Sequence, residues 1–234
     1  MDTKGVLLDF YGTLARATRW AGPDEVLSDH GYTLNHDARA IYFSDGVDGV
    51  EHDEHSKSRD HYVAWQRERA LAMLAAADVH PGEYEAILEK LHQGTANRAM
   101  EAYDEVPGVL TALRDRGLRI FICSNWDWDL REAVEESGLT DLVDGMVSSA
   151  WVGVRKPHPR IYAETLAEAR LEPGACLFAG DTWGADVEGP LAAGLRPIYL
   201  RRDGHWPDHT RAAEDPIRSD VPVTKDLQGV LDQL

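Results

Sequence analysis

Polar side chains that could carry out chemistry come directly after short apolar segments of this 234-residue sequence. The acidic, hydroxyl and amide groups are placed as follows: Asp9 after residues 6–8, Ser124 and Asn125 after residues 120–123, and Asp181 after residues 176–179. Two further charged groups are Lys156, just before a predicted helix, and Asp186, a few residues beyond Asp181. If these segments converge in the fold, one site holds three carboxylates, a hydroxyl, an amide and an ammonium group.

This combination suits attack by a carboxylate on a phosphorus or carbon centre, with a covalent ester as the intermediate. Because a carboxylate and a phosphoryl group repel each other, such a site needs a divalent cation and a lysine to neutralise charge. Asp9 and Asp181 offer the hard oxygen ligands that Mg²⁺ prefers, and Ser124 and Lys156 can hold the remaining phosphoryl oxygens. The residue types therefore favour a magnesium-dependent site for an anionic phosphoryl substrate.

The elements that must position these groups are predicted from the apolar pattern. Unalternated apolar runs at 6–8, 120–123, 176–179 and 197–200 are typical of strands buried on both faces of a parallel sheet. Helical spacing lies between them, for example in residues 159–171. This alternation predicts an α/β fold with a doubly wound, Rossmann-like parallel sheet. Ligands of such sheets bind at the carboxyl ends of the strands, where the polar groups stand.

The segment of residues 16–100 departs from this rhythm, because no strand-like apolar run is visible in it. Apolar residues at helical spacing predict helices near residues 62–74 and 84–91 instead. The sequence therefore predicts a core domain of residues 1–15 and 101–234, with a helical insertion after the first strand.

An acidic stretch at residues 44–60 divides the helical insertion and is interpreted as a solvated loop. It contains His52 and His55, whose spacing and surroundings match no metal-ligand pattern. We therefore expect this stretch to be exposed and to take no part in binding a metal.

The overall negative charge of the chain makes some classes of binding partner unfavourable. With 24 basic and 41 acidic residues, the formal net charge is −17, which disfavours binding to nucleic acid or to an anionic membrane surface. Two cysteines are too few for a disulfide framework, and no apolar run approaches the ~20 residues that span a bilayer. We expect a cytoplasmic protein.

In this order, the chemistry-bearing segments resemble the four motifs of the haloacid dehalogenase (HAD) superfamily of hydrolases. Beyond Asp9-x-x-Gly12-Thr13, the similarity extends to the runs 124–127, 152–157 and 180–194. The helical insertion stands where one subgroup of that superfamily carries a helical cap. The resemblance implies a hydrolase, since most members are phosphatases of small metabolites and a minority are dehalogenases or other hydrolases.

The resemblance also implies a role for each motif residue. Asp9 would be the nucleophile and an Mg²⁺ ligand, with the main-chain carbonyl of Tyr11 and the carboxylate of Asp181 as further ligands. Tyr11 would also belong to the catalytic residues through its place in the first motif.

Four other residues would act on the substrate or on each other. Ser124 and Asn125 would bind the phosphorylated substrate, and Lys156 would neutralise charge on both substrate and nucleophile. Asp186 would orient Lys156 or a metal-bound water.

Tyr11 departs from the pattern of the phosphatases, which usually have a second aspartate at this position as general acid and base. A positioned acid–base group contributes about 10²–10⁴ in rate. Tyrosine can donate a proton, but it is a poor base at neutral pH. The sequence therefore predicts a preference for good leaving groups, or an acid supplied by the cap or the substrate.

Three functions remain open at this point. A metal-independent 2-haloacid dehalogenase is favoured by Tyr11, because halide leaves without a proton. An Mg²⁺-dependent phosphatase is favoured by Asp181, because a second carboxylate beside Asp9 is costly without a cation to hold both. A catalytically weak HAD domain that binds a ligand or a partner is the third. We expect the phosphatase, acting on a small phosphorylated metabolite as a monomer or homodimer.

Overall fold

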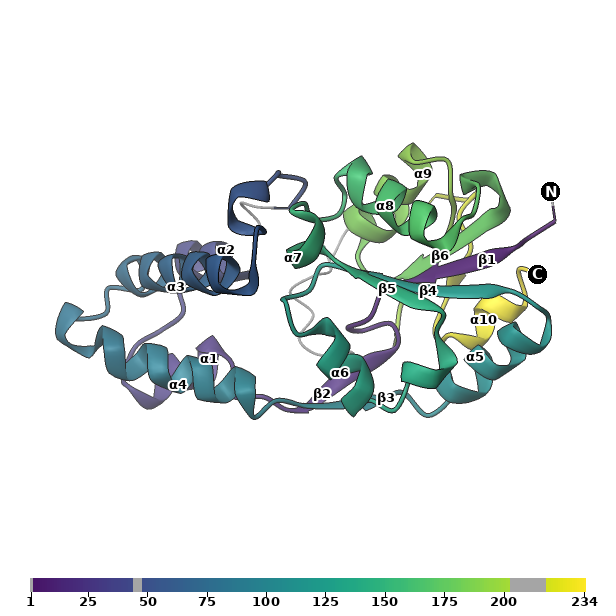
Figure 1. The fold of residues 1–234 in the computed structure, drawn as a ribbon. Helices are drawn as coiled ribbons and strands as arrows, with labels where there is room; N and C mark the ends of the chain where they lie inside the picture. The colour runs from purple at the N-terminus through teal and green to yellow at the C-terminus, as the bar shows by residue number, and fades with distance from the viewer. Residues whose placement is uncertain (1, 44–47, 203–217) are drawn as a thin grey trace.

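The computed structural model describes residues 2–43, 48–202 and 218–234, and its main feature is a six-stranded parallel sheet (Figure 1). In the spatial order β5-β4-β1-β6-β7-β8, the strands are Gly145–Ser148, Arg119–Ser124, Gly5–Leu8, Cys176–Gly180, Arg196–Leu200 and Val223–Thr224. All neighbouring pairs run parallel. The predicted α/β fold class is confirmed, and β5 and β8 are strands that the apolar runs did not reveal.

Helices cover both faces of this sheet, because successive residues of a strand point to opposite sides. Val6 of β1 shares an apolar cluster with Leu110, and the next residue, Leu7, shares a different cluster with Tyr162. The first face carries α5 (Val106–Asp115), α6 (Leu130–Glu136) and α10 (Gln228–Leu231), and the second carries α8 (Pro159–Ala169) and α9 (Gly189–Ala192). Short elements complete the core: α7 (Ser149–Val152), η3 (Thr140–Leu142), η4 (Pro173–Ala175) and the π-helical turn η5 (Trp183–Glu188).

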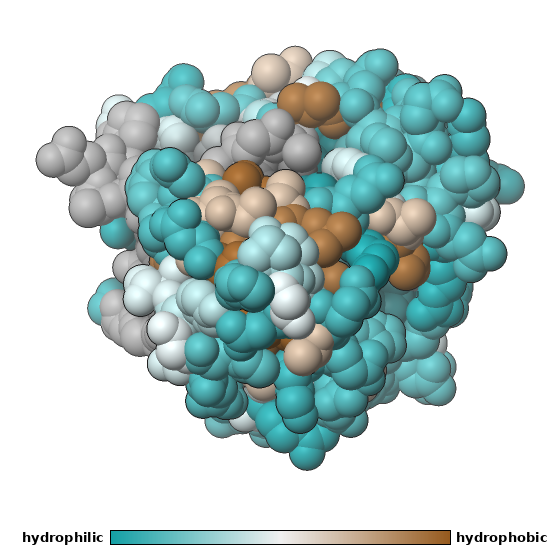
Figure 2. All heavy atoms as spheres, turned by 90° about the vertical axis from the view of Figure 1, so that its left-hand side faces the viewer, coloured by the Kyte–Doolittle hydropathy of each residue, from teal (hydrophilic) through white to brown (hydrophobic). Residues whose placement is uncertain are grey.

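A group of helices lies beyond the carboxyl ends of the strands (Figure 1). Its members are α1 (Pro23–Asp29), α2 (His36–Phe43), α3 (Arg59–Ala76) and α4 (Tyr84–Ala96), with the short η2 (Pro81–Glu83) before the last. Figure 2 shows that the face turned away from the sheet is mainly hydrophilic, with a smaller group of apolar side chains near its middle. Within the described ranges no helix is both long and apolar enough to span a bilayer. The predicted helices near 62–74 and 84–91 correspond to α3 and α4.

Two short strands lie at the ends of the helical segment, where the sequence shows no strand-like apolar run. β2 (Ala15–Arg19) and β3 (Ala99–Ala102) pair antiparallel at the two ends of the helical segment. Neither strand has a continuous apolar run, because each is short and mostly half-exposed. The two strands carry the chain out to the helices and back to the core.

The expectation of a solvated acidic loop agrees with most of the described residues between 48 and 60, which are exposed, but it is wrong at His52. Residues 44–47 lie outside the described residues, but His52 is 5% exposed and precedes the 3-10 helix η1 (Asp53–His55). The rings of His52 and His55 each stack on Trp65 of α3, with centroids 4.9 and 4.8 Å away. Burial, aided by the charge of Arg155, lowers the pKa of His52 to about 4, so this ring is neutral at physiological pH. The composition of residues 44–60 could not predict this stacking, because Trp65 lies outside that stretch.

Candidate active site

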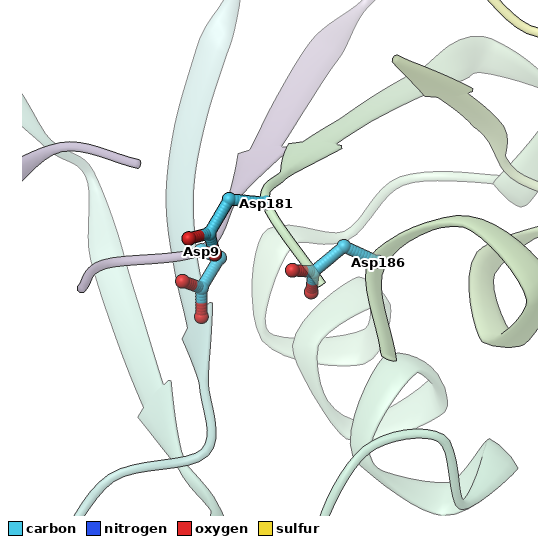
Figure 3. A group of neighbouring side chains, drawn as sticks. All are labelled: Asp9, Asp181 and Asp186. Atoms are coloured by element: carbon cyan, nitrogen blue, oxygen red, sulfur yellow. The ribbon is translucent and has the colours of Figure 1, made fainter. Parts of the chain in front are cut away.

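Three carboxylates meet at the carboxyl edge of the sheet (Figure 3). Asp9 directly follows β1 and Asp181 directly follows β6, and these strands are hydrogen-bonded neighbours. Asp186 comes from η5, and one carboxylate oxygen of each residue lies within 4.8 Å of those of the other two. All three residues are buried, with at most 7% of their surface exposed. The fold thus brings together side chains that lie far apart in the sequence.

Lys156 lies against two of these carboxylates. Its Nζ donates to Asp9 Oδ1 over 2.7 Å and to Asp186 Oδ1 over 2.6 Å, and only 1% of the residue is exposed. Burial alone would lower the pKa of Lys156, but the carboxylates of Asp186 and Asp9 outweigh that effect and raise it. The side chain is therefore a permanent ammonium ion in the site.

The charges of this group fit a divalent cation. Three buried carboxylates lie within 4.8 Å of one another, and burial raises the pKa of Asp186 to about 6 although Lys156 acts to lower it. The donor atoms are hard oxygens, which suit Mg²⁺, Ca²⁺ or Mn²⁺ rather than a soft metal. Asp9, Asp181 and Asp186 are therefore the residues that could hold such an ion.

Ser124 and Asn125 lie at the end of β4, next to β1. Ser124 Oγ donates to Asp9 Oδ1 over 2.9 Å, the same oxygen that accepts from Lys156. The amide of Asn125 is paired with the main chain of Lys156: Oδ1 accepts from its N–H at 2.6 Å, and Nδ2 donates to its carbonyl at 3.0 Å. Asn125 thus fixes the backbone of the lysine, and its predicted contact with substrate stays a prediction.

Hydrogen bonds within its own turn hold Asp186 in place, and Gly180, which has no side chain, leaves room for its carboxylate. Its Oδ2 accepts from the Thr182 N–H at 2.9 Å, and its own N–H donates to the Thr182 carbonyl at 2.7 Å. A Cβ on Gly180 would lie 2.3 Å from the Asp186 carboxyl carbon. A glycine is therefore required at the end of β6 for Asp186 to reach Lys156.

Tyr11 belongs to a tight turn directly after Asp9. The Gly12 N–H donates to the Ala15 carbonyl at 2.8 Å, and Gly12 adopts a φ of 80°, which a side chain disfavours. The Tyr11 ring is half-buried and tilted against Trp126, with centroids 6.1 Å apart. Burial and the negative charge of Asp181 raise the pKa of Tyr11, so its hydroxyl is neutral at physiological pH. Ligation of a metal by its main-chain carbonyl stays a prediction.

Arg202 is a buried residue beside the site that the sequence analysis did not single out. It is 7% exposed, and it donates to the carbonyls of Gly12 at 3.2 Å and Thr13 at 2.8 Å. Its guanidinium also bonds Glu105 at 2.6 Å and stacks on the ring of Tyr103 at 3.7 Å. Arg202 therefore fixes the turn that follows the candidate nucleophile. The only sequence signal was its place just after the apolar run 197–200.

The helical segment contacts the core directly beside this site. Asp127, shortly after Ser124, accepts hydrogen bonds from Tyr62 Oη at 2.9 Å and Gln66 Nε2 at 2.7 Å, both on α3. Trp128 lies 6.0 Å from the Tyr62 ring. The helices beyond the sheet therefore stand over the strand ends that carry the carboxylates.

Comparisons with known proteins identify relatives of the chain. A family model described as haloacid dehalogenase-like hydrolase matches residues 3–194. Haloacid dehalogenase-like hydrolase domain-containing protein 3 of Mus musculus is 36% identical over 39% of this chain and 36% of its own length. The phosphoserine phosphatase of Thermus thermophilus is 31% identical over 50% of this chain and 47% of its own. The chain thus spans about a third to a half of the length of these relatives.

Two solved structures show how widely the fold is shared. A HAD family hydrolase from Deinococcus radiodurans, with bound phosphate and sodium, superposes with a TM-score of 0.66 at 24% identity, covering 98% of this chain and 93% of that one. An L-2-haloacid dehalogenase superposes with a TM-score of 0.62 at 20% identity, covering 100% and 99%. These likenesses concern the fold alone. With the family model matched over most of its length, the chain belongs to the haloacid dehalogenase-like hydrolases.

Proposed function

We propose that this hydrolase is a Mg²⁺-dependent phosphatase of a small phosphorylated metabolite, acting through an aspartyl-phosphate at Asp9. The observation that carries the proposal is the placement of Asp181 beside Asp9 and Asp186, in a buried group of hard oxygen donors within 4.8 Å of one another, next to the ammonium of Lys156. The named phosphatases among the relatives support it, since the phosphoserine phosphatase matches half of the chain.

The proposed reaction uses the residues at the strand ends in two steps. Asp9 attacks the phosphorus as the bond to the leaving oxygen breaks, and that oxygen leaves as an anion or takes a proton from solvent water. Water then attacks the phosphorus of the acyl phosphate, which releases phosphate and restores the Asp9 carboxylate. Lys156 Nζ and Ser124 Oγ, which both bond Asp9 Oδ1, lie where they can also hold phosphoryl oxygens. A bound Mg²⁺ would neutralise charge between nucleophile and substrate.

Asp186 is assigned a supporting role in this scheme. Its hydrogen bond to Lys156 and its anchorage by the Thr182 N–H keep the ammonium directed at Asp9. Residues 16–100 are assigned as a cap domain over a core of residues 1–15 and 101–234, since α3 contacts the core beside Ser124 through Asp127. Cap residues would then select the organic part of the substrate.

A second candidate is a metal-independent dehalogenase, which Tyr11 favours because a departing halide needs no proton. Halide release from 2-chloropropionate in EDTA would identify this activity. A weakly catalytic, ligand-binding domain would instead show no turnover over a broad panel while phosphorylated ligands raise its melting temperature. Neither alternative uses the three neighbouring carboxylates as ligands of a metal ion.

Removal of divalent metal is expected to abolish phosphate release. With para-nitrophenyl phosphate, whose leaving group needs little help from an acid, EDTA should lower the rate by roughly a hundredfold or more because the carboxylates then repel the substrate. Added Mg²⁺ should restore it. Phosphate release at an unchanged rate in EDTA, after exhaustive dialysis against the chelator, would exclude a metal-dependent phosphatase.

A further inference from the structure

Residues 48–53, here called the clasp, lie directly on the segment that carries Lys156. The His52 N–H donates to the Gly153 carbonyl at 2.6 Å, and Glu51 forms an antiparallel bridge with Val154. These contacts join a segment of the helical insertion to a core loop about a hundred residues later in the chain. The clasp is thus an added piece of backbone pairing outside the main sheet.

Charged side chains extend this pairing on both sides of the lysine. Asp53 accepts two hydrogen bonds from Arg160, at 3.0 and 2.5 Å, and Arg160 also donates to the Val152 carbonyl at 2.8 Å. A Cβ on Gly153 would lie 2.4 Å from Asp53 Oδ1 and 2.9 Å from Asp53 Cα. The fit between the clasp and this loop therefore leaves no room for a side chain at residue 153.

At its other end, the clasp is connected to the backbone of Lys156 through the side chains of Arg155 and Asn125. Asp48 Oδ1 accepts from Arg155 Nε at 2.7 Å and, more weakly, from Asn125 Nδ2 at 3.5 Å. Arg155 directly precedes Lys156, and the Asn125 amide bonds both the N–H and the carbonyl of Lys156. Asp48 thus supports the two groups that hold the lysine main chain.

We propose that the clasp positions the catalytic lysine, with Asp48 and Asp53 as positioning residues that act through Arg155, Asn125 and Arg160. The inference rests on the proposed function, because it assigns a kinetic consequence to the placement of Lys156. A reacting group displaced by about 1 Å can cost a hundredfold in rate. The helical insertion therefore contributes to catalysis through the lysine as well as through contacts with substrate.

The test removes both clasp carboxylates at once in Asp48→Ala/Asp53→Ala. With para-nitrophenyl phosphate and saturating Mg²⁺, kcat should fall about tenfold while KM changes less than about twofold, because a misplaced Lys156 loses more stabilisation of the transition state than of the bound substrate, which Ser124 still contacts. Amide hydrogen exchange, followed by mass spectrometry in peptides covering residues 153–160, should become faster. An unchanged kcat, or unchanged exchange in these peptides, would overturn the proposal.

Two comparison variants separate positioning from other effects. Asp48→Asn/Asp53→Asn keeps oxygen acceptors for the arginines without the charge, so it should recover most of kcat and of the protection from exchange. Arg59→Ala breaks a different, exposed ion pair between α3 and the core, at 3.5 Å from Glu132, and should leave both measurements at wild-type values. An equal loss in the Ala and Asn variants, or a tenfold loss in Arg59→Ala, would refute positioning by the clasp.

The exchange measurement also separates this inference from the proposed function. If the wild-type chain releases no phosphate from the probe with Mg²⁺, the proposed function fails. Faster exchange at 153–160 in the Ala variant would still establish that the clasp holds the lysine segment, and unchanged exchange would refute it.

Discussion

Replacement of Asp9 by asparagine is expected to lower kcat for phosphate release by roughly 10⁴-fold or more. The amide is a very weak nucleophile, and it cannot offer the negative oxygen that a cation beside Asp181 would bind. The fold should survive, because Lys156 keeps its ion pair with Asp186 and one of three crowded carboxylates is gone. Initial rates with para-nitrophenyl phosphate and Mg²⁺ measure the effect, and the melting temperature checks folding.

A rate for Asp9→Asn within tenfold of the wild-type rate would show that Asp9 is not the nucleophile. Asp186→Asn is the useful companion variant, since it changes the same chemical group in the same cluster. If Asp186 only orients Lys156, its replacement should cost far less, about 10²-fold at most. Equal losses in the two variants would contradict the difference in roles.

Replacement of Lys156 by methionine is expected to damage both activity and stability. Methionine fills a similar volume but leaves the carboxylates of Asp9 and Asp186 buried without the ammonium that both contact. Loss of one partner from a buried ion pair costs about 3–5 kcal/mol. The free energy of unfolding, from urea titration, should fall by about that amount, and kcat/KM should fall by roughly a hundredfold or more.

Magnesium should partly reverse the loss of stability in this variant, because a bound cation would restore positive charge among the carboxylates. Lys90→Met on the exposed surface of α4 makes the same chemical change away from the site and should leave stability within about 0.5 kcal/mol. A Lys156→Met variant as stable as Lys90→Met would contradict the buried ion pairs described above.

The parts of the fold that the sequence predicted are those with strong local signals. A strand buried on both faces must be apolar throughout, so β1, β4, β6 and β7 are visible as unalternated runs, and polar residues at their ends mark the site. β2 and β3 are half-exposed, and their pairing depends on a partner about eighty residues away. No local pattern of residues reveals such a pairing.

Among the residues of the site, too, those in local motifs could be predicted, and those that act through distant contacts could not. Asp9, Lys156 and Asp181 stand in motifs, and the structure brings them together. Arg202 and Asp48 act by binding main-chain or side-chain groups from distant segments, and each resembles an ordinary surface residue in the sequence. The contacts of these two residues can be identified only in the three-dimensional fold, because their partners lie far away in the sequence.

The most direct test of the proposed mechanism is detection of a phosphoryl group on Asp9. The chain is mixed with para-nitrophenyl phosphate and Mg²⁺, quenched in acid at a series of short times and digested, and its peptides are weighed by mass spectrometry. Because Tyr11 replaces the aspartate that would activate water, hydrolysis of the acyl phosphate should be slow and the intermediate should accumulate. The expected result is one added phosphoryl group on the peptide containing Asp9, absent in Asp9→Asn. Steady phosphate release with that peptide unmodified at every quench time would contradict the mechanism.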